Sequence, residues 1–215
     1  MRHLIKILVI LFFVSLPAYS AVKGGLEYSI PIDYSKISRE ELETKAGVYY
    51  QLALKTFNGK INDEMTAALN MYKILQSQNP SDTTYNIRLG HLYDILGMNK
   101  YAKGCFYAAI GSDDSLPEPY FRLGEFYYRR QFYKRALKFY KEAYKKGFSN
   151  HYDTLYKIGD IYEKLGDTEA ALKYLKLASK QNPNSELDAK IRRVENANQL
   201  NREYYSDTRI RLIER

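Results

Sequence analysis

Three stretches in the middle of the chain repeat one pattern at a nearly constant spacing. In each, a large apolar residue precedes a glycine, and a tyrosine follows the glycine three positions later. A fixed period of this length indicates a linear array of stacked units, because an ordinary helical bundle does not require one. The glycines lie 34 and 35 residues apart, in the copies Leu89-Gly90 with Tyr93, Leu123-Gly124 with Tyr127, and Ile158-Gly159 with Tyr162.

A second series follows each copy and predicts a second helix in every unit. Small residues flank a large one at positions i, i+4 and i+7, which share one face of a helix. A glycine inside a helix costs about 1 kcal/mol relative to alanine, so three glycines at one phase indicate that two helices approach closely there. The series comprises Ala102, Phe106 and Ala109, then Ala136, Tyr140 and Ala143, then Ala171, Leu175 and Ala178.

Together these positions resemble the tetratricopeptide-repeat family, whose unit is a helix–turn–helix of about 34 residues. The resemblance implies an all-α fold: a right-handed α-solenoid of tetratricopeptide-like helix–turn–helix repeats with a C-terminal capping helix. An upstream copy keeps only the second-helix series, at Ala68, Tyr72 and Leu75. The predicted units are a degenerate one at about 49–82, then 83–116, 117–151 and 152–185.

Further helices are predicted on both sides of the clear units. Ser38 and Glu41 have the spacing of a capping box, which starts a long helix before the degenerate unit. Residues 186–202 form an amphipathic helix with Leu187 and Ile191 on one face, placed to cap the end of the array. The predicted limits are 37–202 for the solenoid, with flexible segments at 21–36 and 203–215.

The first residues predict an export signal. A basic start precedes an unbroken apolar run from Ile7 to Val14, and small residues precede a cleavage site near Ser20. The run is shorter than the roughly 20 residues that cross a bilayer. We therefore expect 1–20 to be a secretory signal peptide and the protein to act in the periplasm or outside the cell. An N-terminal membrane anchor is the alternative.

Composition and motifs predict no catalytic centre. The single cysteine, Cys105, excludes an internal disulfide and a cysteine-cluster zinc site, and we expect it to be a buried, inert thiol. His91 and His151 lie far apart, and no phosphate-binding loop, zinc-protease motif or nucleophile elbow occurs. We therefore predict that the protein is not an enzyme and uses no cofactor or metal.

In the family that the chain resembles, the first helices of successive units line a concave groove that holds a partner polypeptide. The resemblance places the second, fifth, ninth and twelfth residues of each unit in this groove. These twelve groove positions hold six acids, three aromatic residues and no Lys or Arg. They are Thr84, Ile87, His91 and Asp94, then Glu118, Phe121, Glu125 and Tyr128, then Asp153, Tyr156, Asp160 and Glu163.

Acids interleaved with aromatic rings favour a partner that carries Lys or Arg. Carboxylates make charge-assisted hydrogen bonds with such side chains, and rings cover their aliphatic stems. The carboxylate-clamp members of the family use Lys and Asn instead, so their chaperone binding is not expected here. We predict an interaction scaffold that binds a protein or peptide in the groove; the alternative for these charges is a solvated face without a ligand.

The positive charge gathers elsewhere. The chain has 33 Lys+Arg against 25 Asp+Glu, a formal charge of +8, and residues 129–146 are densely basic. On the convex side this basic patch favours anionic lipid or a cell-wall polymer, and a merely solubilising face is the other possibility. Export argues against a nucleic-acid partner, and the sequence makes no prediction of oligomeric state. The patch comprises Arg130, Lys134, Arg135, Lys138, Lys141 and Lys145.

Overall fold

The computed structural model describes residues 34–213. The predicted signal peptide at 1–20, the segment 21–33 and the last two residues lie outside the described residues. The chain divides into two units after Ser35, and the second unit, which begins at Lys36, carries the array. Within the described residues all regular secondary structure is helical, so the all-α prediction is confirmed.

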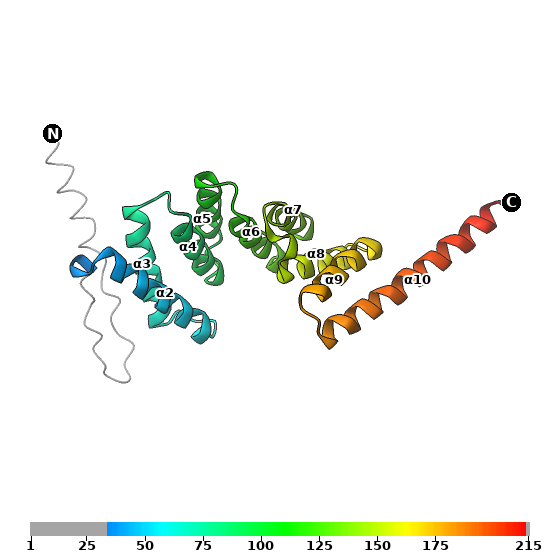
Figure 1. The fold of residues 1–215 in the computed structure, drawn as a ribbon, viewed down its shortest axis with the longest axis horizontal. Helices are drawn as coiled ribbons and strands as arrows, with labels where there is room; N and C mark the ends of the chain where they lie inside the picture. The colour runs from blue at the N-terminus through cyan, green and yellow to red at the C-terminus, as the bar shows by residue number, and fades with distance from the viewer. Residues whose placement is uncertain (1–33, 214–215) are drawn as a thin grey trace. The chain divides into compact units, whose positions relative to one another are not determined.

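The helices follow one another as antiparallel pairs that pack on their neighbours (Figure 1). Members of a pair contact each other most extensively, and the second helix of each pair contacts the first helix of the next. Two short 3-10 turns, η1 (Tyr34–Lys36) and η2 (Phe148–Asn150), complete the described part. The pairs are α2 (Arg39–Thr56) with α3 (Asp63–Gln78), α4 (Thr83–Ile95) with α5 (Asn99–Ser112), α6 (Pro117–Arg129) with α7 (Tyr133–Lys145), and α8 (Tyr152–Lys164) with α9 (Thr168–Gln181), followed by α10 (Ser185–Ile213).

The recurring glycines allow the two helices of each pair to approach closely, as the pattern predicts. A Cβ atom added at Gly124 would lie 2.7 Å from the ring of Tyr140. The same construction at Gly90 and Gly159 meets Phe106 at 2.6 Å and Leu175 at 2.8 Å. These distances are too short for an unshifted methyl group, so the backbone of each first helix is packed directly against the large residue of the second.

The turn inside each clear unit uses a left-handed backbone conformation at one equivalent position. Gly97 has φ +71° and Gly166 has φ +84°, values that glycine adopts without steric cost. Gln131 takes this place in the middle unit with φ 60°. A glutamine there reads as an ordinary polar residue in the sequence, so this turn was not marked by the usual signal.

The first pair begins earlier than the predicted degenerate unit. The Ser38 side chain accepts a hydrogen bond from the Glu41 backbone N–H at 3.2 Å, which confirms the predicted start of this helix. Helix α2 then runs for 18 residues to Thr56, so the pair occupies 39–78 instead of 49–82. Buried Tyr50 and Ala53 give α2 its packing face against α3.

Helix α10 covers the exposed end of the last pair. Leu187, Ile191 and Val194 are buried against a core that includes Leu155 and Leu175. This confirms the capping role, but the helix is 29 residues long and continues to Ile213, so the predicted tail at 203–215 is helical as far as that residue. Among the described residues, none of the helices combines the length and apolar character that a bilayer crossing needs.

Candidate functional site

Two of the twelve groove positions lie in the core. Ile87 and Phe121 are each only 8% exposed. The Phe121 ring is covered by Tyr140, Phe148 and His151, whose ring centroids lie 5.6, 5.9 and 5.1 Å away. Our assignment of these two residues to a partner surface is therefore wrong, because the fifth position of both units packs between helices. The equivalent residue of the third unit, Tyr156, remains partly exposed.

Asp94 is held at the junction between α4 and α6. Its side chain is 1% exposed and forms ion pairs with Arg129 and with Arg130, the latter at 2.8 Å. Arg130 also donates to the Phe126 carbonyl at 2.8 Å, and its guanidinium lies 3.7 Å from the centre of the Phe126 ring. Arg130 thus belongs to a junction between units, which corrects its assignment to the convex basic patch.

His91 lies on α4 beside the first pair. Its Nδ1 atom is 2.5 Å from the Tyr50 hydroxyl, which donates when Nδ1 carries no proton. Burial, reinforced by the charges of Arg122 and Arg129, lowers the pKa of His91 to about 3. The side chain is therefore neutral at physiological pH and hydrogen-bonded to the first pair, and it is not a base that titrates there.

The Tyr128 side chain links α6 to α8. Its hydroxyl donates to Asp160 Oδ2 at 2.5 Å, and the Lys157 ammonium lies 4.1 Å from the centre of its ring. Burial and the hydrogen bond to Asp160 raise the pKa of Tyr128 well above its usual value. On the same helix, Glu125 accepts a hydrogen bond from Tyr140 and pairs with Arg129 at 3.6 Å.

Two further acids are neutralised by α10. The Lys190 ammonium, 13% exposed, lies 2.5 Å from Asp160 Oδ1 and 2.7 Å from Glu163 Oε2. Arg193 donates to Glu163 Oε1 at 2.8 Å. Burial alone would raise the pKa of Asp160, but hydrogen bonds from Lys190 and Tyr128 outweigh it and hold that pKa below its usual value. The pKa of Glu163 is lowered in the same way by Lys190 and Arg193.

The surface formed by the first helices is therefore close to neutral, whereas the groove positions alone predict an acidic one. Helices α4, α6 and α8 together carry five Lys or Arg and six acids. Glu118 pairs with Arg122 at 2.8 Å, and of these six acids only Asp153, 61% exposed, has no closer cation than His151 at 4.0 Å. The cations lie outside the four groove positions counted in each unit, so those positions alone do not reveal them. An acid and a base four residues apart, as in Glu125 and Arg129, is the signal that identifies one of them.

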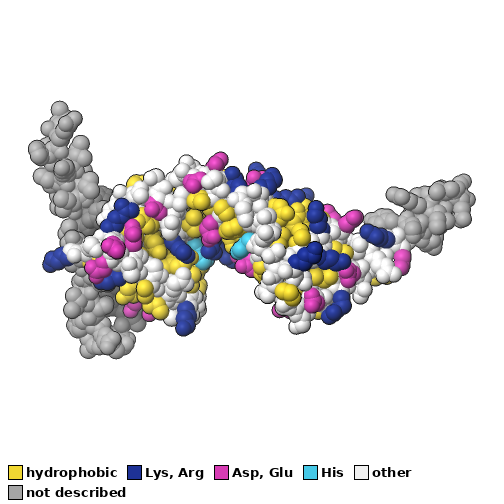
Figure 2. All heavy atoms as spheres, in the orientation of Figure 1, with side chains coloured by type: hydrophobic (Ala, Val, Ile, Leu, Met, Phe, Trp, Pro, Cys, Tyr) yellow, Lys and Arg dark blue, Asp and Glu magenta, His cyan; other side chains and the backbone are white. Residues whose placement is uncertain are grey.

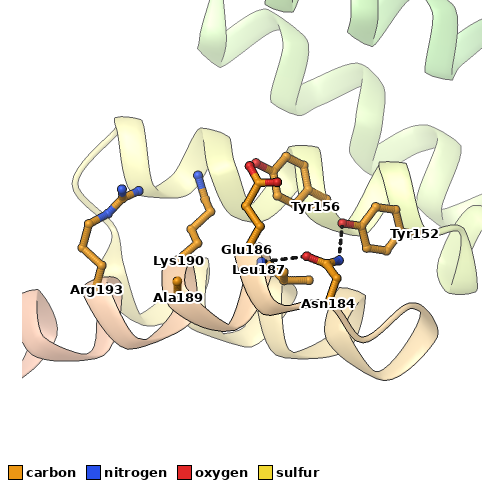
Figure 3. A pocket seen from close by; sticks show the side chains of 8 residues that line it. All are labelled: Tyr152, Tyr156, Asn184, Glu186, Leu187, Ala189, Lys190 and Arg193. Carbon is orange, nitrogen blue, oxygen red and sulfur yellow. Dashed lines mark hydrogen bonds between the residues drawn. The ribbon is translucent and has the colours of Figure 1, made fainter.

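A surface pocket of about 540 Å³ lies where α8 meets the start of α10. Tyr152 and Tyr156 form one wall, with ring centroids 6.0 Å apart and planes inclined by 20°. Figure 3 shows Lys190 and Arg193 projecting from α10 on the side where the two rings lie. The Asn184 amide donates to the Tyr152 hydroxyl at 3.3 Å, while its oxygen accepts from the Leu187 N–H and caps α10.

The remaining residues of the basic patch lie on α7. Lys134, Arg135, Lys138 and Lys145 are exposed, and Lys145 pairs with Glu142 at 2.9 Å. Lys141 is partly buried, with its ammonium 5.1 Å from the centre of the Tyr162 ring.

Cys105 is a buried free thiol, and burial raises its pKa to about 11. Among residues 34–213, no three His, Cys, Asp or Glu side chains are grouped so that they could hold a metal ion.

Comparisons with known proteins agree with the helix pairs. Residues 152–185 match the tetratricopeptide-repeat family. A comparison with curated proteins gave no match. Among solved structures, YrrB, described as a TPR protein with an unusual peptide-binding site, is 25% identical over 56% of this chain and 62% of its own, with a TM-score of 0.53. MamA is 19% identical over 66% and 84%, with a TM-score of 0.57. TTC0263 from Thermus thermophilus is 18% identical over 73% and 82%, with a TM-score of 0.56. The solenoid of helix–turn–helix repeats is thus the fold that this chain shares with them.

Proposed function

We propose that this tetratricopeptide-repeat protein is a non-enzymatic scaffold that binds a partner polypeptide along α4, α6, α8 and the start of α10. The observation that carries the proposal is the pocket between α8 and α10, where two parallel tyrosine rings and polar groups lie together at the surface. A concave site lined by rings with a few polar groups is typical of ligand recognition. The peptide-binding site described for YrrB supports this class of partner.

The contacts that this site offers are aromatic and hydrogen-bonding. At Asp160 and Glu163 a partner Lys or Arg would have to displace Lys190 or Arg193, and Glu186 is the one acid of the pocket lining that could receive it directly. A proline or aromatic side chain can instead pack on Tyr152 and Tyr156 without breaking any ion pair. We therefore favour an extended segment with proline or aromatic residues over the Lys- or Arg-containing partner that the groove positions predict.

The place of action rests on the sequence alone. The basic start and apolar run of residues 1–20 support export, so the partner would be a protein of the periplasm or of the cell exterior.

Selection from a defined random peptide library displayed on phage tests the binding site. Peptides selected on the full chain should be rich in proline and aromatic residues. Synthesised and labelled, such a peptide should bind about 10-fold more weakly to Tyr156→Leu, which keeps the apolar packing but removes the ring, as fluorescence anisotropy would measure. The matched control is Tyr101→Leu on α5, away from the pocket, and its affinity should be unchanged. Equal binding to wild type and Tyr156→Leu would refute the site, and enrichment of Lys and Arg would restore the acidic-groove hypothesis.

A further inference from the structure

The charge of the array is divided between its two sets of helices. The second helices α5, α7 and α9 carry ten Lys or Arg and only two acids, Glu142 and Glu169. The first helices α4, α6 and α8 carry five and six. Helix α3 does not share the excess, because it has two acids and one lysine. The positive charge therefore forms a continuous feature of α5, α7 and α9, which we call the second-helix surface.

Most of these cations form no ion pair. In the described part of the chain, the ion pairs on the second-helix surface are Lys145 with Glu142 and Lys176 with Glu195. Lys134 and Lys138 are exposed one turn apart on α7 and make none. Unpaired lysines on one stripe of a helix leave their field directed outward.

Large rings stand beside these cations. Tyr101, Tyr107 and Phe132 are 59%, 47% and 53% exposed. The two tyrosine rings each pack on an aromatic neighbour. The Tyr101 ring centroid lies 5.4 Å from that of Tyr93, and the Tyr107 ring centroid lies 6.4 Å from that of Phe139. Figure 2 shows basic and hydrophobic side chains side by side over the part of the array that contains α7, α8 and α9. The rings are held by neighbours and remain open to a partner.

One cation of this surface lies over Phe132 and over the buried ring of Tyr127. The Arg135 guanidinium lies 5.8 Å from the centre of the Tyr127 ring and 5.6 Å from that of Phe132. Tyr127 in turn stacks on Phe139 with planes inclined by 3° and centroids 5.4 Å apart. A surface of this kind presents apolar rings and positive charge at one depth. It goes beyond the proposed function, which uses the opposite set of helices.

We propose that the second-helix surface binds the head-group layer of a membrane that contains anionic phospholipid. Lys and Arg near such a layer each contribute about 1 kcal/mol through attraction to the negative lipids. Tyrosine and phenylalanine rings enter the boundary between head groups and acyl chains. There the apolar ring contacts the acyl chains while the tyrosine hydroxyl stays hydrated. A soluble polyanion would engage the lysines but give Phe132 no apolar environment, which is why the bilayer surface is favoured.

Flotation of the full chain with vesicles tests the proposal. Binding to phosphatidylglycerol–phosphatidylcholine vesicles should exceed binding to pure phosphatidylcholine vesicles and should fall steeply with salt. The ratio between the two vesicle types is the readout, because it cancels any contribution of the apolar residues near the N-terminus. Lys134→Gln with Lys138→Gln should lower this ratio by about 25-fold, or about 5-fold for each lysine. Lys55→Gln with Lys60→Gln removes the same charge from the first pair and should leave it nearly unchanged.

A second pair of variants separates lipid from a soluble polyanion. Tyr101→Ser with Tyr107→Ser should weaken vesicle binding by about 5-fold or more, because the variant loses the free energy gained when these exposed rings move from water into the membrane interface. Binding to heparin should be unaltered. Circular dichroism verifies that each variant is folded. The proposal is overturned if anionic vesicles are not preferred, if both lysine doubles act alike, or if the tyrosine double binds vesicles as well as wild type does.

Discussion

At the scale of single residues, the glycines of the array have two different roles. Gly124 lies against the Tyr140 ring, so its missing side chain makes room for a neighbour. Gly104 and Gly111 lie on α5 with no heavy atom within 4 Å of an added Cβ. Gly111 lies in the last turn of α5, but Gly104 is a glycine in the helix interior that packing does not demand, and it should lower helix stability with no compensating contact.

Gly124→Ala should destabilise the protein and Gly104→Ala should stabilise it. The added methyl group at 124 would force the Tyr140 ring or the helix backbone to move, at a cost of about 1–3 kcal/mol. At 104 the same change relieves the entropy cost of glycine and should contribute about 1 kcal/mol. Urea unfolding followed by circular dichroism gives both free energies of unfolding. Changes of equal sign in the two variants would show that the close contact does not determine the cost.

At the scale of helices, ionic contacts join the second helix pair to the third and the last pair to α10. Asp94 on α4 pairs with Arg129 of α6 and with Arg130, which follows that helix. On α8, Asp160 pairs with Lys190 of α10 and Glu163 pairs with Arg193 of α10. A buried charge destabilises the protein unless its ion-pair partner is also present, so each of these junctions needs its own matched side chains.

Lys190→Met should remove stability that depends on pH. The pKa values of Asp160 and Glu163 are lowered in the folded protein, so their pairing stabilises it above their ordinary values of 3.8 and 4.5. That contribution is lost as the pH falls through the lowered values, because the unfolded chain then binds more protons. Replacing the ammonium while keeping the aliphatic stem should cost about 1–3 kcal/mol at pH 7. The difference from wild type should shrink toward pH 3.

Thermal unfolding at pH 7 and pH 3.5 measures this effect. Lys176→Met is the matched control, because Lys176 on α9 and Glu195 on α10 form an exposed pair, 55% and 41% exposed. Such a pair contributes at most about 1 kcal/mol. If the Lys190 variant showed the same loss at both pH values, packing of its stem would be the cause.

The fold was predictable because its signals are local. The spacing of Gly124, Tyr140 and their counterparts defines which faces of two successive helices meet, and the structure confirms those contacts. The charge of the first-helix surface could not be predicted from the position of residues within the repeat unit. Long side chains such as Lys190 and Arg130 reach across a junction, and position along one helix does not state how far a side chain extends.

Two boundaries, the end of α10 and the start of the first helix pair, were also predicted incorrectly from the sequence. No Gly or Pro follows Pro183, so nothing stops α10 at 202, and an apolar face that ends there does not end the helix. In α2 the early start follows from the Ser38 cap, which was recognised, although the repeat pattern placed the unit ten residues later. Helix length is set here by capping and propensity, and repeat phase carries no information on it.

At the scale of the whole molecule, the array depends on its last helix. Leu155 and Leu175 belong to a core that α10 closes with Leu187, Ile191 and Val194. The Thr168 hydroxyl also donates to Asn198 at 2.8 Å. A repeat array without such a cover would present an apolar face to water.

Two truncations should separate the part of α10 that closes the core from the part beyond it. A chain ending at Gln199 keeps every contact just named and should unfold within a few degrees of the full chain. A chain ending at Gln181 loses the cover, exposes the Leu155–Leu175 core and should unfold at a temperature lower by about 10 °C or more. Thermal melts and binding of a hydrophobic dye measure the difference. Equal melting temperatures for the two truncations would contradict the capping role.

The close contacts within the three clear units also bear on misassembly. A chain of similar repeats can pair a helix with the wrong neighbour while it folds. The residue that meets the glycine differs in every unit, being Phe106, Tyr140 and Leu175. Of these three, only Tyr140 brings a hydroxyl, and Glu125 stands beside Gly124 to accept it. The residues that correspond to Glu125 are His91 on α4 and Asp160 on α8, and each is already bonded to another tyrosine hydroxyl, so Tyr140 seated there would have to compete for an occupied acceptor. The variation among the copies thus favours one first helix as the partner of each second helix, so that a repetitive sequence still specifies one order of assembly.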